Sequence, residues 1–278
     1  MKNLPILLFL MITSRVLGQP ADVNSTFPDV KQAIQEHNNS FYAEHATSYI
    51  YTDESGVEWP YRLFLPPDYD PKNEYPLLLS FHGAGSRGAD NLKQLRPWIA
   101  GWMDEQVQKE HPCIILMPQC PSKQQWVNVP WKEGSYVFKD IAPSRPMKLV
   151  KKIFDKVVEE NSVDKNRIYV MGASMGGYGT WYFLMRYRKL IAAAVPICGG
   201  GDPSMAKKIR HIPIWAFHGD KDPVVPLSGS TDMISALQSF KDNNARITIY
   251  PGVGHNAYEL AWNDPALVRW VFSQEKGH

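Results

Sequence analysis

The sequence predicts an α/β protein in which helices cover both faces of a mostly parallel sheet. Short apolar runs, typical of strands that are buried on both faces, recur along the chain. Amphipathic helical patterns lie between these runs, and such an alternation favours parallel strands. The 278 residues, 44% of them hydrophobic, suffice for one large core or two small ones. Because no repeat or linker divides them, we expect one α/β domain.

Strands are expected at seven places. The first, Tyr61–Leu65, ends at Pro66 and Pro67. The other six are almost purely apolar: Leu77–Phe81, Ile114–Met117, Ile168–Met171, Ala192–Ile197, Ile212–Phe217 and Ile247–Tyr250.

Helices are expected between and after these strands. One follows Pro146 and repeats apolar residues at helical spacing, from Val150 to Val157. The last has Asp264 as its N-cap. Two more are expected at Gly176–Tyr187 and Thr231–Lys241.

The first 18 residues have the pattern of a secretory signal peptide. Lys2 precedes an apolar run, and Val16-Leu17-Gly18 supplies small residues before a cleavage site at Gln19. The run is too short to anchor the chain in a bilayer. We therefore expect a secreted or periplasmic protein, in which residues 1–18 are removed, 19–48 form an N-terminal arm and 49–278 form the α/β domain.

Charge excludes two classes of partner. Lys and Arg number 30 and Asp and Glu 28, but Lys2 and Arg15 lie in the leader, so the rest of the chain carries no net charge. Without net charge or long basic runs, the chain has no electrostatic footprint for nucleic acid or an anionic membrane. No later stretch is apolar for long enough to span a bilayer, so no membrane anchor is expected.

The three cysteines permit at most one disulfide. Cys113 and Cys120 flank a strand whose length separates them by about 23 Å, which is beyond disulfide reach. Cys120 and Cys198 both follow strands, so this pairing stays open. The motifs that bind zinc are absent from the sequence, and we expect no metal.

A nucleophile motif follows one of the expected strands. Gly172-Ala173-Ser174-Met175-Gly176 matches G-x-S-x-G, lies directly after a strand and opens a helix. This is the context of the nucleophile elbow, a sharp turn that exposes its serine beside a helix N-terminus. The motif makes Ser174 the candidate nucleophile.

A serine hydroxyl needs a base, and His255 is the candidate. In proteins with this elbow, an acid and then a histidine follow the serine along the chain. Of the eight histidines, only His255 and the terminal His278 come after any acid that follows the penultimate strand. His255 ends the glycine-rich segment that starts at Pro251, after the last strand.

The acid is expected in the loop after the strand Ile212–Phe217. Asp222 is our first candidate, with the role of fixing the tautomer of His255. Asp220 is the alternative in the same loop, and Asp202 is a more distant candidate.

Two backbone N–H groups are expected to hold a developing oxyanion. One belongs to Met175, directly after the serine. The other comes from the small residues after the strand Leu77–Phe81, with Ala84 as first candidate and Gly85 as second. His82, at the start of that loop, is expected to be structural.

The segments His82-Gly83-Ala84-Gly85-Ser86-Arg87-Gly88 and Gly172-Ala173-Ser174-Met175-Gly176-Gly177 together resemble the α/β-hydrolase superfamily. Within it, the chain is similar to secreted carboxylesterases of the phospholipase/carboxylesterase and dienelactone-hydrolase-like branch, near polyhydroxybutyrate depolymerases and feruloyl esterases. His218-Gly219, Asp222 and Gly254-His255 fit the same pattern. The resemblance, from about Tyr61 to Phe272, implies the α/β-hydrolase fold and hydrolysis by a serine, a histidine and an acid.

Substrate information comes from the intervals between motifs. Gly199 to His211 leave no room for the large lid domain that many α/β-hydrolases carry. The long irregular segment is Gln119–Ser144, which contains Trp126 and Trp131. These aromatic residues either pack the segment onto the body or bind sugar and aryl groups of a substrate, and our hypothesis takes Trp126 and Trp131 as substrate-binding residues.

The sequence therefore predicts an exported serine carboxylesterase that needs no cofactor and cleaves an ester, which is either polysaccharide-linked or an aryl ester such as a ferulate. A serine peptidase related to the prolyl oligopeptidases shares all of these candidate residues, and a non-catalytic binding protein with the same fold is the third hypothesis. The sequence leaves the oligomeric state open.

Overall fold

The computed structural model describes residues 43–95 and 97–277. The expected signal peptide and most of the expected N-terminal arm lie outside these residues.

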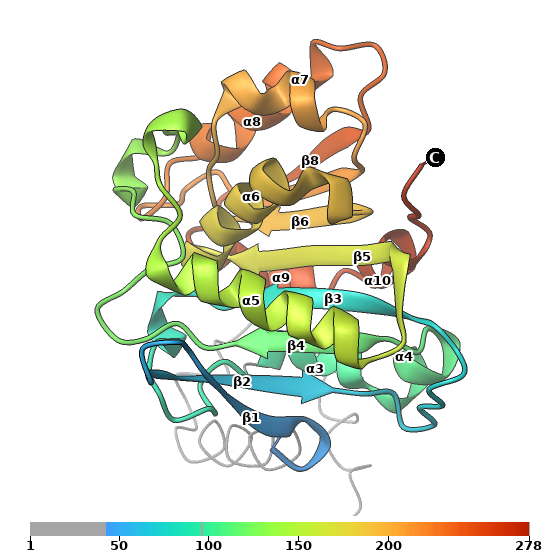
Figure 1. Cartoon of the computed structure of the whole chain (residues 1–278). Coiled ribbons are helices and arrows are strands. Elements are labelled where there is room, and N and C mark those ends of the chain that lie inside the picture. Colours follow the sequence, from blue (N-terminus) through green and yellow to red (C-terminus); the bar gives the residue numbers. More distant parts are fainter. Residues whose placement is uncertain (1–42, 96, 278) are drawn as a thin grey trace, which may run out of the picture. The chain divides into compact units, whose positions relative to one another are not determined.

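The described residues contain one eight-stranded sheet with the order β1-β2-β4-β3-β5-β6-β7-β8 (Figure 1). The pairs β1–β2 and β2–β4 are antiparallel, and all the pairs from β4 to β8 are parallel. The prediction of a mostly parallel sheet is therefore confirmed. The strands are β1 (Thr47–Thr52), β2 (Glu58–Phe64), β3 (Tyr75–Phe81), β4 (Ile114–Pro118), β5 (Val163–Ala173), β6 (Ala193–Ile197), β7 (Ile214–Gly219) and β8 (Ala245–Tyr250).

Strand β1, which the sequence did not predict, is an edge strand whose residues are mostly exposed. An exposed edge strand lacks the apolar run by which the buried strands are found. Because β1 begins at Thr47 and pairs with β2, the sheet includes the last residues of the segment expected as an arm.

Helices pack on both faces of the sheet, as expected (Figure 1). Successive side chains of a strand point to opposite faces, so Leu77 and Leu79 of β3 lie in one core and Leu78 in the other. The first core is covered by α5 (Arg145–Glu160), α6 (Met175–Tyr187), α7 (Ala206–Ile209) and α8 (Ser228–Gln238). The second is covered by α3 (Pro97–Met103), α9 (Ala257–Trp262) and α10 (Pro265–Phe272), and α4 (Glu105–Glu110) follows α3.

The interval between β6 and β7 contains only the 3₁₀ helix η6 (Pro203–Met205) and α7, so no lid domain is inserted there. The long segment between β4 and α5 contains the 3₁₀ helices η3 (Trp131–Glu133) and η4 (Phe138–Asp140). Tyr178 and Tyr182 of α6 hold this segment by donating hydrogen bonds to the carbonyls of Trp131 and Ile141. No helix among the described residues is long and apolar enough to cross a membrane.

All three cysteines are buried and unpaired, so the disulfide that the sequence left open between Cys120 and Cys198 is not formed. Burial raises the pKa of each thiol to about 12.

The parallel strands bring their carboxyl ends to one edge of the sheet. In the pairing register, Phe81 of β3 lies opposite Gly172 of β5, and Ala173 lies opposite Ile197 of β6. Gly219 of β7 lies opposite Tyr250 of β8. The loops that carry the candidate site residues all leave the sheet at this edge.

Candidate active site

Ser174 lies at a sharp turn between β5 and α6. Its backbone has φ 60° and ψ −122°, a conformation that costs a non-glycine residue on the order of 1–3 kcal/mol. The N–H of Ser174 donates to the carbonyl of Ile197, 2.9 Å away, which ties the turn to β6. The sheet thus holds the serine in strained geometry in front of the first turn of α6.

Two glycines make this turn sterically possible. A Cβ on Gly176 would lie 2.0 Å from the carbonyl oxygen of Phe81, and a Cβ on Gly172 would lie 2.5 Å from the same oxygen. No side chain fits at these distances, so the motif needs glycine on both sides of Ser174.

His255 bridges Ser174 and Asp222. Its Nε2 lies 2.7 Å from Oγ of Ser174, and its Nδ1 lies 2.7 Å from Oδ2 of Asp222. The Asp222 side chain is fully buried, whereas that of His255 is 23% exposed. The structure thus brings together the three residues that the sequence proposed, from the loops after β5, β7 and β8.

The Asp222 carboxylate is held ionised. Burial acts to raise its pKa, but hydrogen bonds from His218, from His255 and from the N–H groups of Val225 and Val224 outweigh burial. The pKa of Asp222 therefore lies well below its usual range. An acid that is ionised at neutral pH beside Nδ1 favours the tautomer of His255 whose Nε2 is free to accept a proton.

The two alternative acids, Asp220 and Asp202, form hydrogen bonds with other groups. Asp220 accepts the N–H of Gly252 at 2.6 Å and so joins the loops after β7 and β8. Asp202 accepts N–H groups of Ser204 and Phe138. Of the three acids, only Asp222 is hydrogen-bonded to His255.

The loop after β3 runs beside Ser174. A Cβ on Gly83 would lie 3.8 Å from Cβ of Ser174, and the 3₁₀ helix η2 (Ala84–Ser86) begins at the next residue. Ala84 and Met175 are the first residues of their helices, so neither N–H has an acceptor within its helix. This arrangement suits the binding of an anionic oxygen next to Ser174, while the role of Ala84 and Met175 stays a prediction.

His82 fixes the start of this loop. Its Nε2 accepts the N–H of Cys120 at 2.9 Å, and its Nδ1 lies 2.7 Å from the carbonyl oxygen of Gly83. Because the ring is buried and both nitrogens have backbone partners, the geometry agrees with a structural role for His82.

Ser174 and His255 line a cavity of about 300 Å³. Trp131 and Ala84 also line it, as do Ser86, Val224 and Tyr258, which the sequence analysis did not single out. These three lie in loops or at a short helix, and no periodicity or motif in the sequence marks them.

Trp126 is not part of this cavity, so the expectation that it binds substrate is wrong. Its side chain is 1% exposed and packs edge-on against Phe81 and His82. Its Nε1 donates to the carbonyl of His82 at 2.9 Å. Trp126 therefore holds the start of the loop after β3 through its contacts with Phe81 and His82, which is the packing alternative that the sequence left open.

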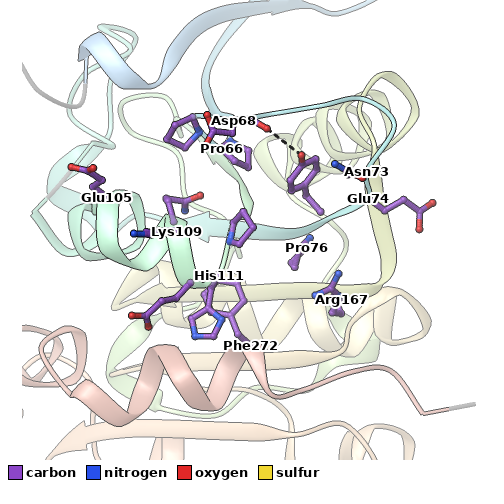
Figure 2. A pocket seen from close by; sticks show the side chains of 15 residues that line it. Pro66, Asp68, Asn73, Glu74, Pro76, Glu105, Lys109, His111, Arg167 and Phe272 are labelled. Carbon is purple, nitrogen blue, oxygen red and sulfur yellow. Dashed lines mark hydrogen bonds between the residues drawn. The ribbon is translucent and has the colours of Figure 1, made fainter.

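A larger cavity, of about 830 Å³, lies near the start of β3, at the opposite ends of the parallel strands from Ser174 (Figure 2). It is lined by Tyr75 and Pro76, where β3 begins, and by residues of α4 and α10. In it His111 stacks on Phe272 with ring centroids 4.8 Å apart (Figure 2). Its lining contains no serine or cysteine, so of these two cavities only the smaller one brings a nucleophile and a base together.

The parallel sheet, the strained serine after β5 and the histidine and acid after β8 and β7 define an α/β-hydrolase. The dienelactone hydrolase family matches residues 115–260, just over half of the chain. The chain belongs to this family.

Several relatives are esterases by name. A thermostable esterase of known structure is 36% identical, with a TM-score of 0.77, over 85% of this chain and 64% of that chain. A bifunctional acetylxylan esterase/xylanase from Neocallimastix patriciarum is 26% identical over 175 residues, which are 63% of this chain and 23% of that protein. A feruloyl esterase module from Clostridium thermocellum, solved with sinapinate, shares the fold at 16% identity and a TM-score of 0.61, over 84% of this chain and 89% of the module. The chain thus spans under two thirds of the thermostable esterase and under a quarter of the bifunctional enzyme.

Proposed function

We propose that the protein is a serine carboxylic-ester hydrolase in which Ser174 is the nucleophile, His255 the base and Asp222 the triad acid. The observation that carries the proposal is that one imidazole lies within 2.7 Å of both the serine hydroxyl and the buried carboxylate. An imidazole held in this way accepts the serine proton as the hydroxyl attacks.

In the acylation step, Oγ of Ser174 bonds to the ester carbonyl carbon while its proton passes to Nε2 of His255. The negative carbonyl oxygen accepts hydrogen bonds from the N–H groups of Ala84 and Met175. The carbon–oxygen bond of the leaving group then breaks, and that oxygen takes the proton from His255. In deacylation a water gives its proton to His255 and attacks the acyl carbon, and Ser174 recovers the proton as the acid leaves. These steps use no cofactor.

The proposed substrate is an acyl or aryl ester, including esters carried by a polysaccharide. Trp131 and Tyr258 give the cavity beside Ser174 aromatic walls, which suit sugar and aryl groups. No lid domain separates β6 from β7, which leaves room for a long substrate. Two of the similar proteins are by name an acetylxylan esterase and a feruloyl esterase, enzymes of the same class.

The test is hydrolysis of a panel by the wild-type protein and by Ser174→Ala. The panel contains p-nitrophenyl acetate, acetylated xylan, methyl ferulate and a prolyl-p-nitroanilide. We expect the wild type to cleave esters and Ser174→Ala to lose on the order of 10⁶-fold in kcat. Amide turnover that equals or exceeds ester turnover would identify a peptidase. Equal rates for the two proteins would refute the site, and no turnover together with no fluorophosphonate labelling would indicate a binding protein.

We also propose that residues 1–18 direct export and are then removed, that 19 to about 46 form an arm and that the catalytic domain follows. The sequence pattern of residues 1–18 supports this proposal. Amino-terminal sequencing of protein collected from the periplasm or medium should begin at Gln19, and a protein that keeps Met1 in the cell would contradict it.

A further inference from the structure

His218 is a buried histidine that the proposed mechanism does not use. It lies in β7, four residues before Asp222, and its side chain is fully buried. Its Nε2 lies 3.3 Å from Oδ2 of Asp222 and 3.1 Å from the carbonyl oxygen of Val225. Its Nδ1 lies 2.8 Å from Oγ of Ser230 in α8.

These contacts fix where the ring carries hydrogen. Nε2 faces a carbonyl oxygen and an ionised carboxylate, both of which only accept hydrogen bonds, so Nε2 must carry the hydrogen. The hydroxyl of Ser230 can either donate to Nδ1 or accept from it, since it also lies 3.1 Å from the carbonyl oxygen of Gly199. His218 therefore presents an N–H to Asp222 in either charge state of its ring.

Two imidazoles thus share one oxygen of Asp222. His255 hydrogen-bonds to Oδ2 from the loop after β8, and Nε2–H of His218, in β7, faces the same oxygen at 3.3 Å while it is shared with the carbonyl oxygen of Val225. Oδ1 accepts the N–H groups of Val224 and Val225, at 2.8 and 3.0 Å. Among residues 43–95 and 97–277, the other titratable groups that interact with this carboxylate are the thiol of Cys198, after β6, and the phenol of Tyr178, in α6.

We propose that His218 is a positioning residue, whose Nε2–H orients the Asp222 carboxylate and draws part of its charge away from His255. This inference rests on the proposed function. Without that N–H, the negative charge on Oδ2 would interact more strongly with His255 and would favour the imidazolium form of that ring. An imidazolium cannot accept the proton of Ser174, so activity would be lost at a higher pH than in the wild type.

The experiment compares two polar variants of similar bulk. The amide of His218→Gln reaches the position of Nε2 and can still donate to Asp222, whereas the shorter His218→Asn reaches only the position of Nδ1. We expect His218→Asn to lose on the order of 10- to 100-fold in kcat and to move the acidic midpoint of the pH–rate profile up by about one pH unit. We expect His218→Gln to stay near the wild type in both. KM should change little, because His218 does not line the cavity.

Each variant is measured by ester hydrolysis and by the rate of fluorophosphonate labelling as a function of pH. Labelling depends on the same base and needs no knowledge of the natural ester. Ile153→Ala, which removes a buried side chain of α5 that does not line the cavity beside Ser174, serves as the control for lost stability without a shifted midpoint. A wild-type midpoint in His218→Asn, or equal damage in both variants, would overturn the proposal.

The wild-type ring can also be observed directly if the variants do not fold. In proton NMR of His255→Ala, a downfield imidazole N–H signal that through-space contacts with Val225 and Ser230 assign to His218 should persist, beside the signal expected from the buried ring of His82. The absence of an assigned signal from His218 would overturn the inference. A wild-type protein with no hydrolysis or labelling that depends on Ser174 would instead refute the proposed function.

Discussion

Nε2 of His255 lies 2.7 Å from Oγ of Ser174, although 81 residues separate the two along the chain. The contact forms because β5 and β8 end at the same edge of the sheet. In the proposed mechanism, the serine proton therefore has an acceptor before any substrate arrives, and the partly exposed ring can pass that proton on.

Asp222→Asn should lower kcat by about 10⁴-fold with little change in the fold, because an amide that donates to Nδ1 stabilises the wrong tautomer of His255. Steady-state kinetics on the preferred ester measure the effect. Asp220→Asn is the matched control, since Asp220 lies in the same loop but accepts the N–H of Gly252 and is not bonded to His255. If Asp220→Asn were the more damaging change, the acid would be misassigned.

Trp126→Ala and Trp131→Ala should have different effects. The first removes a fully buried ring and should lower the free energy of unfolding by about 3–5 kcal/mol. The second removes a wall of the cavity and should raise KM for aryl or sugar esters about tenfold, at a smaller cost in stability. Urea unfolding and kcat/KM on the ester panel measure both quantities. Unchanged kcat/KM for Trp131→Ala on every ester would exclude its role in binding.

Gly176→Ala should prevent folding or cost more than about 4 kcal/mol, because its Cβ would lie 2.0 Å from the carbonyl oxygen of Phe81. Gly101→Ala is the matched control. A Cβ at Gly101, in α3, has no neighbour within 4 Å and should stabilise the protein by about 0.5–1 kcal/mol. Thermal and urea unfolding compare the two, and equal effects would contradict the close approach at Gly176.

Asp90 should make stability depend on pH. Burial acts to raise its pKa, but hydrogen bonds from the N–H groups of Lys93 and Leu92 and from Gln119 lower the pKa to about 2. The folded pKa lies below the unfolded value of about 3.9, so the stabilisation is present above pH 4 and is lost as the pH falls toward 2. Asp90→Asn should therefore cost about 1 kcal/mol at pH 7, and the difference should shrink below pH 4. Parallel stability curves for the two proteins would contradict this assignment.

The three cysteines should be unreactive in the folded protein. Burial keeps them as thiols, with each pKa raised to about 12, and removes them from solvent. A maleimide reagent at pH 7 should label none of them in the native state and all three in denaturant without reductant. Labelling of only one thiol in denaturant would show that two cysteines had paired.

The sequence was informative wherever one short segment contains its own physical constraint. G-x-S-x-G directly after a strand indicated Ser174 as the candidate nucleophile, because the glycines, the strand and the helix that the turn needs are contiguous. Buried parallel strands were found because both of their faces must be apolar. The edge strand β1 and the short helices α3, α4, α7 and α9 carry no such pattern and were missed.

Tertiary structure decided what depends on contacts between distant segments. Trp126 and Trp131 lie in the same irregular segment, and the sequence does not distinguish them. In the structure, Trp126 is hydrogen-bonded to the loop after β3, and Trp131 lines the cavity beside Ser174. Asp220 and Asp222 lie in one loop, and only the path of the chain after β7 turns Asp222 toward His255.

By itself, the sequence determined the α/β architecture, the candidate serine and the chain order in which a candidate acid and histidine follow it, because each depends on local pattern or chain order. The structure alone decided which acid meets the histidine, which tryptophan borders the cavity and that His218 shares the carboxylate of Asp222. The physical reason is that hydrogen bonds and burial depend on distances of a few ångströms between residues far apart in the chain, and only the packed sheet sets those distances.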